Sequence, residues 1–354
     1  MAKIDDNIII EALKKVNDPE LGRSIIDLDM VEKISQDNGT VNVTIRLTIP
    51  GCPLKHRFEE DVTAALKPIE GVTDVKLNFT AMKPQERAAV AKKMTGRAES
   101  PVFDDVNIKH VIAIASGKGG VGKSTVTANL AYALKDLGYK VGVIDSDVYG
   151  FSIPRMMGAE GLPTVIEDAM IPVVRDGIKV MSMGFFLEED QAVLWRGPML
   201  HKTVTQFLTQ VYWDKLDYLL IDLPPGTGDV TLTISQTVPD AHLLVVTTPQ
   251  PAASGVAQRV ADLAEKANFK MLGVIENMSY FVGPDGNKQY IFGEGGGKVL
   301  STKLNTPLLG QIPLETGVRE GGDLGEPVAA SGKGDAAGVF KAAADSLVKY
   351  IEKK

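Results

Sequence analysis

The chain has 354 residues, of which 44% are apolar, 23% charged and 6% aromatic. This composition excludes a disordered or fibrous protein, and the length exceeds what one hydrophobic core usually organises, so we expect two domains. No apolar run approaches 18 residues, so neither a transmembrane helix nor a membrane partner is expected. The net charge of −7 disfavours binding to polyanions by overall charge. A single cysteine and acidic residues near the N-terminus predict a reduced, cytoplasmic protein without a secretory signal.

The first 82 residues alternate between helical and strand periodicity. Helices are expected over residues 5–16 and 56–66, and strands over 40–47 and 72–79. We therefore expect a small α+β domain over residues 1–82. The polar stretch 83–107 lacks an apolar period and predicts a linker or a short exposed helix.

From residue 108 onward, short apolar runs alternate with helix-length amphipathic segments. The runs cover residues 111–115, 141–144, 218–221, 243–246, 271–275 and 308–312. Runs of this length suit strands that are buried on both faces, and their alternation with helices indicates βαβ crossovers. The sequence thus predicts an α/β domain over residues 108–354, with a mainly parallel sheet flanked by helices.

The first of these runs is followed by a glycine-rich segment that matches G-x-x-x-x-G-K-[ST]. The segment consists of Gly117, Lys118, Gly119, Gly120, Val121, Gly122, Lys123, Ser124 and Thr125. Its glycines allow backbone N–H groups to face a polyphosphate, and the helix that follows adds its positive dipole. Lys123 is expected to reach the β- and γ-phosphates and Ser124 to ligate Mg²⁺. A glycine-rich turn that matches by chance is the alternative.

Polar residues stand at the ends of three later strands. Asp145 and Asp147 follow the strand 141–144, and the alternative to a catalytic role is an aspartate-rich turn. Asp222 ends the strand 218–221 and is expected to hold a water on Mg²⁺, since this cation prefers oxygen ligands. Asn277 is expected to bind adenine through its amide, or else to form a simple turn. The glycine-containing loop 222–229 is expected to sense the γ-phosphate.

The run Gly-Lys-Gly-Gly-Val-Gly-Lys-Ser-Thr resembles the deviant Walker A motif of the MinD/ParA/arsenical-pump class of P-loop ATPases. The resemblance implies a homodimer that sandwiches two ATP molecules, in which Lys118 touches the nucleotide of the partner. It also implies that Asp147 positions or activates the attacking water and that Asp145 supports the magnesium shell. Lys118, Lys123 and Asp147 are therefore the expected catalytic residues.

Four further segments resemble the Mrp/ApbC branch of this class. They are residues 145–150, 195–199, 222–229 and 276–280. The N-terminal domain resembles the SufT/PaaD type through Asp18-Pro19-Glu20 and the segment 50–54. The resemblance implies an ATP-dependent carrier or assembly factor for iron–sulfur clusters, with client apo-proteins or other assembly proteins as partners.

The sequence departs from the Mrp pattern at its cluster site. Mrp proteins commonly carry Cys-x-x-Cys after Asn-Met-Ser-Tyr-Phe, and the two positions correspond here to Gly283 and Gly286. Glycine offers no thiolate ligand, and Cys52 is the one thiol of the chain. Cys52 is either a cluster or thiol ligand or a small residue in a turn.

Two functions follow from these patterns. The first is a MgATP-hydrolysing cluster carrier in which Cys52 is the available thiol. The second is an ATP-switched regulatory protein that has lost the cluster site, for which nucleic acid becomes a candidate partner. The modestly basic tract 87–97 would serve such a partner, and otherwise it is a solvated linker.

Overall fold

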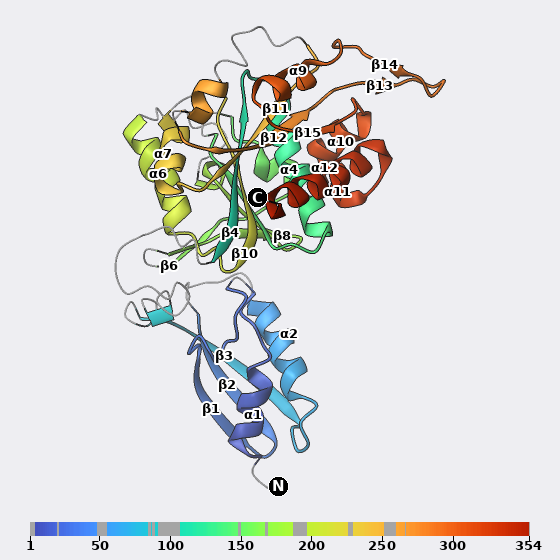
Figure 1. Ribbon diagram of the computed structural model, residues 1–354. Helices are drawn as coiled ribbons and strands as arrows, with labels where there is room; N and C mark the ends of the chain where they lie inside the picture. The colour runs from blue at the N-terminus through green and yellow to red at the C-terminus, as the bar shows by residue number, and fades with distance from the viewer. Residues whose placement is uncertain are drawn as a thin grey trace. The chain divides into compact units, whose positions relative to one another are not determined.

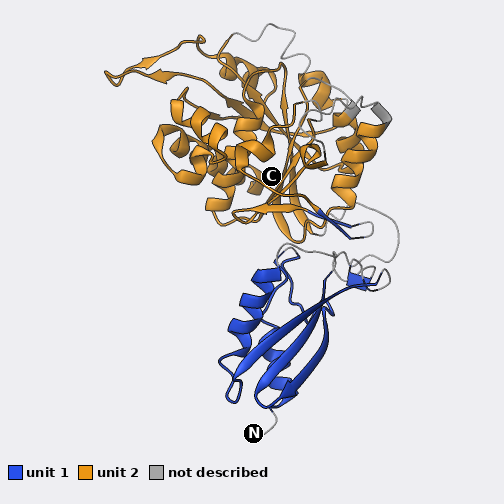
Figure 2. Ribbon diagram, turned by 180° about the vertical axis from the view of Figure 1, so that it is seen from behind, with its two compact units in different colours: residues 1–100, 164–171 blue, residues 101–163, 172–354 orange. Residues whose placement is uncertain are grey.

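Figure 1 shows the computed structural model of the chain. The structure describes residues 4–19, 21–47, 55–83, 86, 89–90, 107–147, 150–166, 169–186, 197–225, 229–250, 260–265 and 267–353. The chain divides into two compact units, which are coloured in Figure 2. Unit 1 comprises residues 1–100 and 164–171, and unit 2 comprises residues 101–163 and 172–354. The expected domain boundaries at 82 and 107 stay predictions.

The described part of unit 1 includes a small mixed sheet and the helices that pack with it. Its elements are α1 (Asp6–Leu13), β1 (Val31–Asp37), β2 (Thr40–Leu47), α2 (Lys55–Leu66), β3 (Asp74–Ala81), β6 (Thr164–Ile166) and β7 (Ala169–Ile171). The sheet order is β1-β2-β3, with β2 antiparallel to β1 and parallel to β3. In the central strand every second residue from Val41 to Leu47 is buried, and α2 packs against β3. This period-two burial gives the unit a one-sided apolar core.

Unit 2 is built around one large sheet. Its strands are β4 (Ile108–Ser116), β5 (Val141–Asp145), β8 (Val173–Arg175), β9 (Ile178–Ser182), β10 (Leu216–Asp222), β11 (His242–Thr247), β12 (Lys270–Glu276) and β15 (Leu308–Gln311). The order across the sheet is β15-β12-β11-β4-β10-β5-β9-β8, and among the described strands of this sheet only the edge pair β8–β9 is antiparallel. The expected mainly parallel α/β architecture is confirmed.

Helices cover both faces of this sheet (Figure 1). They are α4 (Lys123–Asp136), α5 (Ile153–Met157), η1 (Met183–Phe186), α6 (Gly197–Thr209), α7 (Asp229–Thr237), α9 (Gly296–Lys303), α10 (Thr316–Leu324), α11 (Val328–Ser331) and α12 (Gly334–Glu352). Helices α4, α11 and α12 pack together on one face, and α6 packs with α7 on the other. The strands can be apolar on both sides because both faces are covered.

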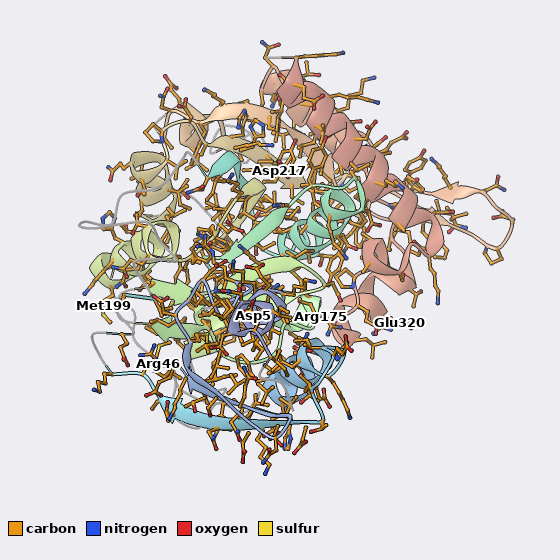
Figure 3. The ribbon with its side chains drawn as sticks, turned by 90° about the horizontal axis from the view of Figure 1, so that it is seen from below. Asp5, Arg46, Arg175, Met199, Asp217 and Glu320 are labelled. Carbon is orange, nitrogen blue, oxygen red and sulfur yellow. The ribbon has the colours of Figure 1, made fainter. Side chains whose placement is uncertain are left out.

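The two edges of the parallel strands have different roles. At the amino edge, the carboxylate of Asp217, labelled in Figure 3, accepts hydrogen bonds from Lys109 Nζ at 2.6 Å and from Lys140 N at 2.8 Å. These bonds join the beginnings of β10, β4 and β5. The carboxyl edge carries the polar residues that the sequence singled out, because parallel strands all end on the same side.

A short hairpin projects from unit 2 near the carboxyl edge. It consists of β13 (Phe281–Val282) and β14 (Lys288–Gln289), and α9 follows it in the chain (Figure 1). No described helix of the chain is long and apolar enough to cross a membrane.

Candidate nucleotide-binding site

The glycine-rich segment forms the turn between β4 and α4. Gly120 and Gly122 adopt φ angles of +75° and +78°, which side chains rarely tolerate. Gly122 is the N-cap of α4, and no side chain caps this helix end. The first N–H groups of a 14-residue helix therefore remain available to an anion, as does the positive end of its dipole.

Asn277 lies directly against this turn. Its Nδ2 donates a hydrogen bond of 2.9 Å to the carbonyl oxygen of Val121. A Cβ atom at Gly122 would lie 2.2 Å from the same Nδ2. The end of β12 therefore supports the shape of the phosphate loop, and Gly122 is required by both its φ angle and its neighbour.

The carboxylate of Asp222 gathers the polar side chains at the start of α4. Lys123 Nζ lies 2.6 Å from Asp222 Oδ1, and Ser124 Oγ donates to Oδ2 at 2.6 Å. Thr127 Oγ1 donates to Oδ1 at 2.9 Å. Asp222 and Lys123 are buried, and a buried charge is stable only when it is paired and hydrogen-bonded. The motif lysine, the motif serine and the strand-ending aspartate thus form one cluster.

A second buried carboxylate lies beside Asp222, because Asp145 pairs with it across β5 and β10. Asp145 accepts hydrogen bonds from the backbone N–H groups of Asp147, Ser152 and Ile153 at 3.0–3.1 Å. Burial, and then the charge of Asp222, raise the pKa of Asp145 to about 7. The carboxyl groups of Asp145 and Asp222 lie on neighbouring strands, and Lys123 is the cation paired with Asp222. The pair of carboxyl groups therefore suits the binding of a further cation.

Asp147 is half-buried at the end of β5. Its Oδ1 accepts a hydrogen bond of 3.1 Å from Gly150 N. Within the described part of the chain, no hydrogen bond is recorded for its other oxygen, so the geometry is compatible with the role that the resemblance implies.

Lys118 lies on the exposed side of the phosphate loop. Its Nζ donates a hydrogen bond of 2.5 Å to Oε1 of Gln250, which follows β11. In this state the lysine is held within its own chain. Gln250 was not among the residues predicted from the sequence, and neither was Thr127. The sequence signal that could have indicated Gln250 is its place as a polar residue shortly after the buried strand 243–246.

A cavity of about 340 Å³ lies beside the phosphate loop. Its apolar lining comes from Met156, Met278, Pro313, Leu314 and Val318. Thr125 and Asn277 also line it, which joins the cavity to the loop. Arg319 on α10 contributes a charged wall and pairs with Asp323 at 2.8 Å and with Glu320, labelled in Figure 3, at 3.1 Å. The cavity has the size and the mixed lining of a small-molecule pocket.

The β13–β14 hairpin does not fit a thiolate-bound cluster. A Cβ at Gly283 would lie 2.7 Å from Oδ1 of Asp285, and Gly286 adopts a φ of +78°. Asp285 instead accepts two hydrogen bonds from Asn287, which close the turn. With glycine at both positions, the hairpin offers no soft ligand.

Several sequence-based expectations fall outside the described residues. They concern Glu20, the segment 50–54 with Cys52, residues 195–196 of the segment 195–199, residues 226–228 of the 222–229 loop, and most of the tract 87–97.

Family models match both parts of the chain. The NUBPL iron-transfer P-loop NTPase model matches residues 107–348, and an iron–sulfur cluster assembly protein model matches residues 7–77. The chain belongs to the NUBPL iron-transfer P-loop NTPase family. This membership confirms the resemblance that the glycine-rich motif and the N-terminal domain indicated.

Curated relatives of this NTPase family match almost the whole chain. Proteins named iron–sulfur cluster carrier protein are 45% identical over 337 residues in Mycobacterium tuberculosis and 44% identical over 330 residues in Synechocystis. The first alignment covers 92% of this chain and 88% of the relative, and the second covers 91% of each. The Bacillus subtilis relative of the same name is 42% identical over 88% of this chain and 89% of its own.

Solved structures match the NTPase part. A nucleotide-binding protein from Archaeoglobus fulgidus, in complex with ADP, is 38% identical with a TM-score of 0.58 and covers 67% of this chain and 93% of its own. The cell-division ATPase MinD of Pyrococcus furiosus is 26% identical with a TM-score of 0.52 and covers 68% of this chain and 98% of its own. The P-loop NTPase fold is therefore shared across both.

Proposed function

We propose that this chain binds and slowly hydrolyses MgATP and uses that cycle to receive iron–sulfur clusters and deliver them to apo-proteins. The observation that carries the proposal is the cluster of Lys123, Ser124 and the buried Asp222 beneath an uncapped helix N-terminus. The names of relatives that share 42–45% of their residues supply the cargo.

The nucleotide is oriented by the loop and the adjoining cavity. Residues 117–125 supply backbone N–H groups and the Lys123 ammonium to the phosphates. On binding, a phosphate oxygen would replace Asp222 as the partner of Lys123. The adenine would enter the apolar cavity, and Asn277 would line the path between base and phosphates. A purine ring gains by burying its faces against Met278 and Leu314.

The donor set fits a magnesium ion. Ser124 Oγ, Asp222 and Asp145 present hard oxygen atoms, and magnesium is commonly held by one or two carboxylates together with substrate phosphates. When bound, the ion would neutralise charge that develops on the phosphates. The raised pKa of Asp145 means that its carboxyl binds a proton in the absence of a cation and releases it when one binds.

Hydrolysis further requires a positioned water and an extra positive charge. Asp147, half-buried beside the carboxylate pair, would orient the water. Lys118 would leave Gln250 and contact the nucleotide of a second copy of the chain, so the active form would be a homodimer. Opening and closing of that dimer would time the transfer of cargo.

The cluster is cargo for which this chain supplies few ligands. The hairpin positions are Gly283 and Gly286, and a dimer would bring one Cys52 from each chain. Two thiolates do not complete a four-thiolate site, so the remaining ligands would come from a small thiol or a client protein. The cytoplasmic location expected from the sequence stays a prediction.

Anaerobic reconstitution tests the carrier function. The chain is incubated with ferrous iron, sulfide and a small thiol, desalted, and assayed for iron and acid-labile sulfide with and without MgATP. We expect the wild-type chain to retain both and to pass them to an apo-ferredoxin, and Cys52→Ala to lose them. Retention by neither protein would contradict the carrier function and favour the alternative, an ATP-switched regulator that has lost the cluster site. DNA binding by the wild-type chain would then be measured.

A further inference from the structure

The turn formed by residues 248–250 contacts two parts of unit 2. On one side, Gln250 Oε1 accepts the hydrogen bond from Lys118 Nζ on the phosphate loop. On the other side, the carbonyl oxygen of Pro249 accepts a hydrogen bond of 3.1 Å from Gly296 N at the start of α9. Helix α9 is the next element after the β13–β14 hairpin along the chain, and residues 290–295 connect the two. The 248–250 turn thus contacts both the phosphate loop and the helix that follows the hairpin.

The contact with α9 is close-packed. A Cβ at Gly296 would lie 2.6 Å from the carbonyl oxygen of Pro249 and 2.7 Å from that of Gln250. The next residue, Gly297, donates a hydrogen bond to the buried carboxylate of Glu276 at 2.5 Å. A movement of the turn toward α9 would therefore displace the start of the helix, since backbone touches backbone there. A movement away from α9 would break the hydrogen bond between Gly296 N and Pro249 O.

The same turn carries an unsatisfied polar group. Thr248 is buried, and its Oγ1 has no hydrogen-bond partner within the described part of the chain. A buried hydroxyl without a partner has a cost in free energy, because it has lost its hydrogen bonds to water. The observed position of the turn is therefore less stable, by this cost, relative to a position in which the Thr248 hydroxyl makes a hydrogen bond.

A polyphosphate competes with Gln250 for the lysine. The negative charge of a phosphate attracts an ammonium group by Coulomb energy in addition to the hydrogen bond, whereas a neutral amide offers only its dipole. An ammonium group that can reach a phosphate, in its own chain or in a second copy, therefore leaves the amide oxygen. The 248–250 turn then loses the side-chain contact that ties it to the phosphate loop.

We propose that Gln250 is a positioning residue that couples the nucleotide site to the β13–β14 hairpin through the 248–250 turn. Without a polyphosphate, Gln250 holds Lys118, and Pro249 holds the start of α9. With a polyphosphate bound, Lys118 departs, and the turn and the base of the hairpin loosen together. The coupling rests on the proposed nucleotide function and adds to it the route by which the nucleotide state reaches the hairpin.

Hydrogen exchange of the full-length chain, measured by mass spectrometry over residues 281–300, tests the coupling. Gln250→Ala removes the acceptor of Lys118 and leaves the backbone contact with α9. Gln250→Glu keeps an acceptor and strengthens it by charge. Gly296→Ala keeps Gln250 and forces the start of α9 away from Pro249. Lys303→Ala, in the last turn of α9, is the matched control.

Without nucleotide, we expect exchange over residues 281–300 to be about five- to tenfold faster in Gln250→Ala than in the wild type, as the loss of one such hydrogen bond implies. Gly296→Ala should behave likewise, whereas Gln250→Glu and Lys303→Ala should match the wild type or exchange more slowly. A non-hydrolysable ATP analogue with magnesium should raise the wild-type rate to that of Gln250→Ala and leave Gln250→Ala unchanged.

Equal exchange in wild type and Gln250→Ala without nucleotide would overturn the coupling. An equal nucleotide response in both proteins would overturn it too. Calorimetry on the same samples separates the two proposals. Absent nucleotide binding by the wild type would refute the proposed function, while the nucleotide-free comparison would still decide whether Gln250 controls the hairpin.

Discussion

At the scale of single residues, Asp222 determines the chemistry of the site. It holds the ammonium of Lys123 and the hydroxyls of Ser124 and Thr127 within 2.6–2.9 Å. Removing either charged member of such a buried group leaves the other charge without a partner. Substitutions in this cluster should therefore be strongly destabilising. When a nucleotide binds with its cation, Lys123 would pair with a phosphate and Asp222 with the cation. Neither buried charge would then be left without a partner.

Asp145 gives the nucleotide-free protein a specific pH dependence. Its folded-state pKa of about 7 lies above its ordinary value, so between those two values the folded chain holds a proton that the unfolded chain has released. The free energy of unfolding should therefore fall, by roughly 1 kcal/mol per pH unit, as the pH rises through that window. Asp145→Asn removes this contribution.

Urea unfolding without magnesium and nucleotide, at pH 5.5 and pH 8, measures the effect. We expect Asp145→Asn to gain stability relative to the wild type at the higher pH. If the difference between the two proteins is the same at both pH values, Asp145 does not carry a raised pKa.

At the scale of elements, the phosphate loop depends on glycines with positive φ angles. Gly122→Ala should destabilise the fold and abolish nucleotide binding, because the new Cβ meets Asn277 Nδ2 as well as the unfavourable φ. Gly138 has a φ of +93° with open space around it, so Gly138→Ala isolates the backbone cost of about 1–2 kcal/mol.

Thermal unfolding compares the stability of Gly122→Ala and Gly138→Ala, and nucleotide titration compares their affinities for nucleotide. Gly138→Ala should bind nucleotide as the wild type does. Equal nucleotide affinity in Gly122→Ala and Gly138→Ala would contradict the close packing of Asn277 on the loop.

Elements with strong periodicity could be predicted, and short or exposed ones could not. The buried run 218–221 predicted β10, and alternation predicted β2 at its observed bounds. Strand β1 was missed because its sequence, with four charged or amide side chains, has no apolar alternation. The three-residue strands β6, β7 and β8 are too short to show a period.

The candidate site divides in the same way. Lys123, Ser124 and Asp222 could be predicted because a local motif and a strand end specify them. The contact of Lys118 with Gln250, 132 residues away, depends on the order of strands β4 and β11 in the sheet. That order is a property of the fold and leaves no local trace in the sequence.

At the scale of the whole molecule, the proposal requires two copies of the chain. With MgATP, light scattering should detect a dimer for the wild type, and Lys118→Ala should retain ATP binding but lose turnover. Lys303→Ala, which removes an exposed lysine at the end of α9, should retain both. Unchanged turnover in Lys118→Ala would remove the role of this lysine in a partner's site.

Calorimetric titration of MgATP into the wild-type chain and Lys123→Ala tests the central claim, that residues 117–125 enclose a nucleotide. We predict one nucleotide per wild-type chain and an affinity at least about tenfold lower for Lys123→Ala, since a charged hydrogen bond is lost. Lys135→Ala, at the far end of the same helix, should bind as the wild type does. No binding heat with the wild type, or equal affinity in Lys123→Ala, would contradict the account.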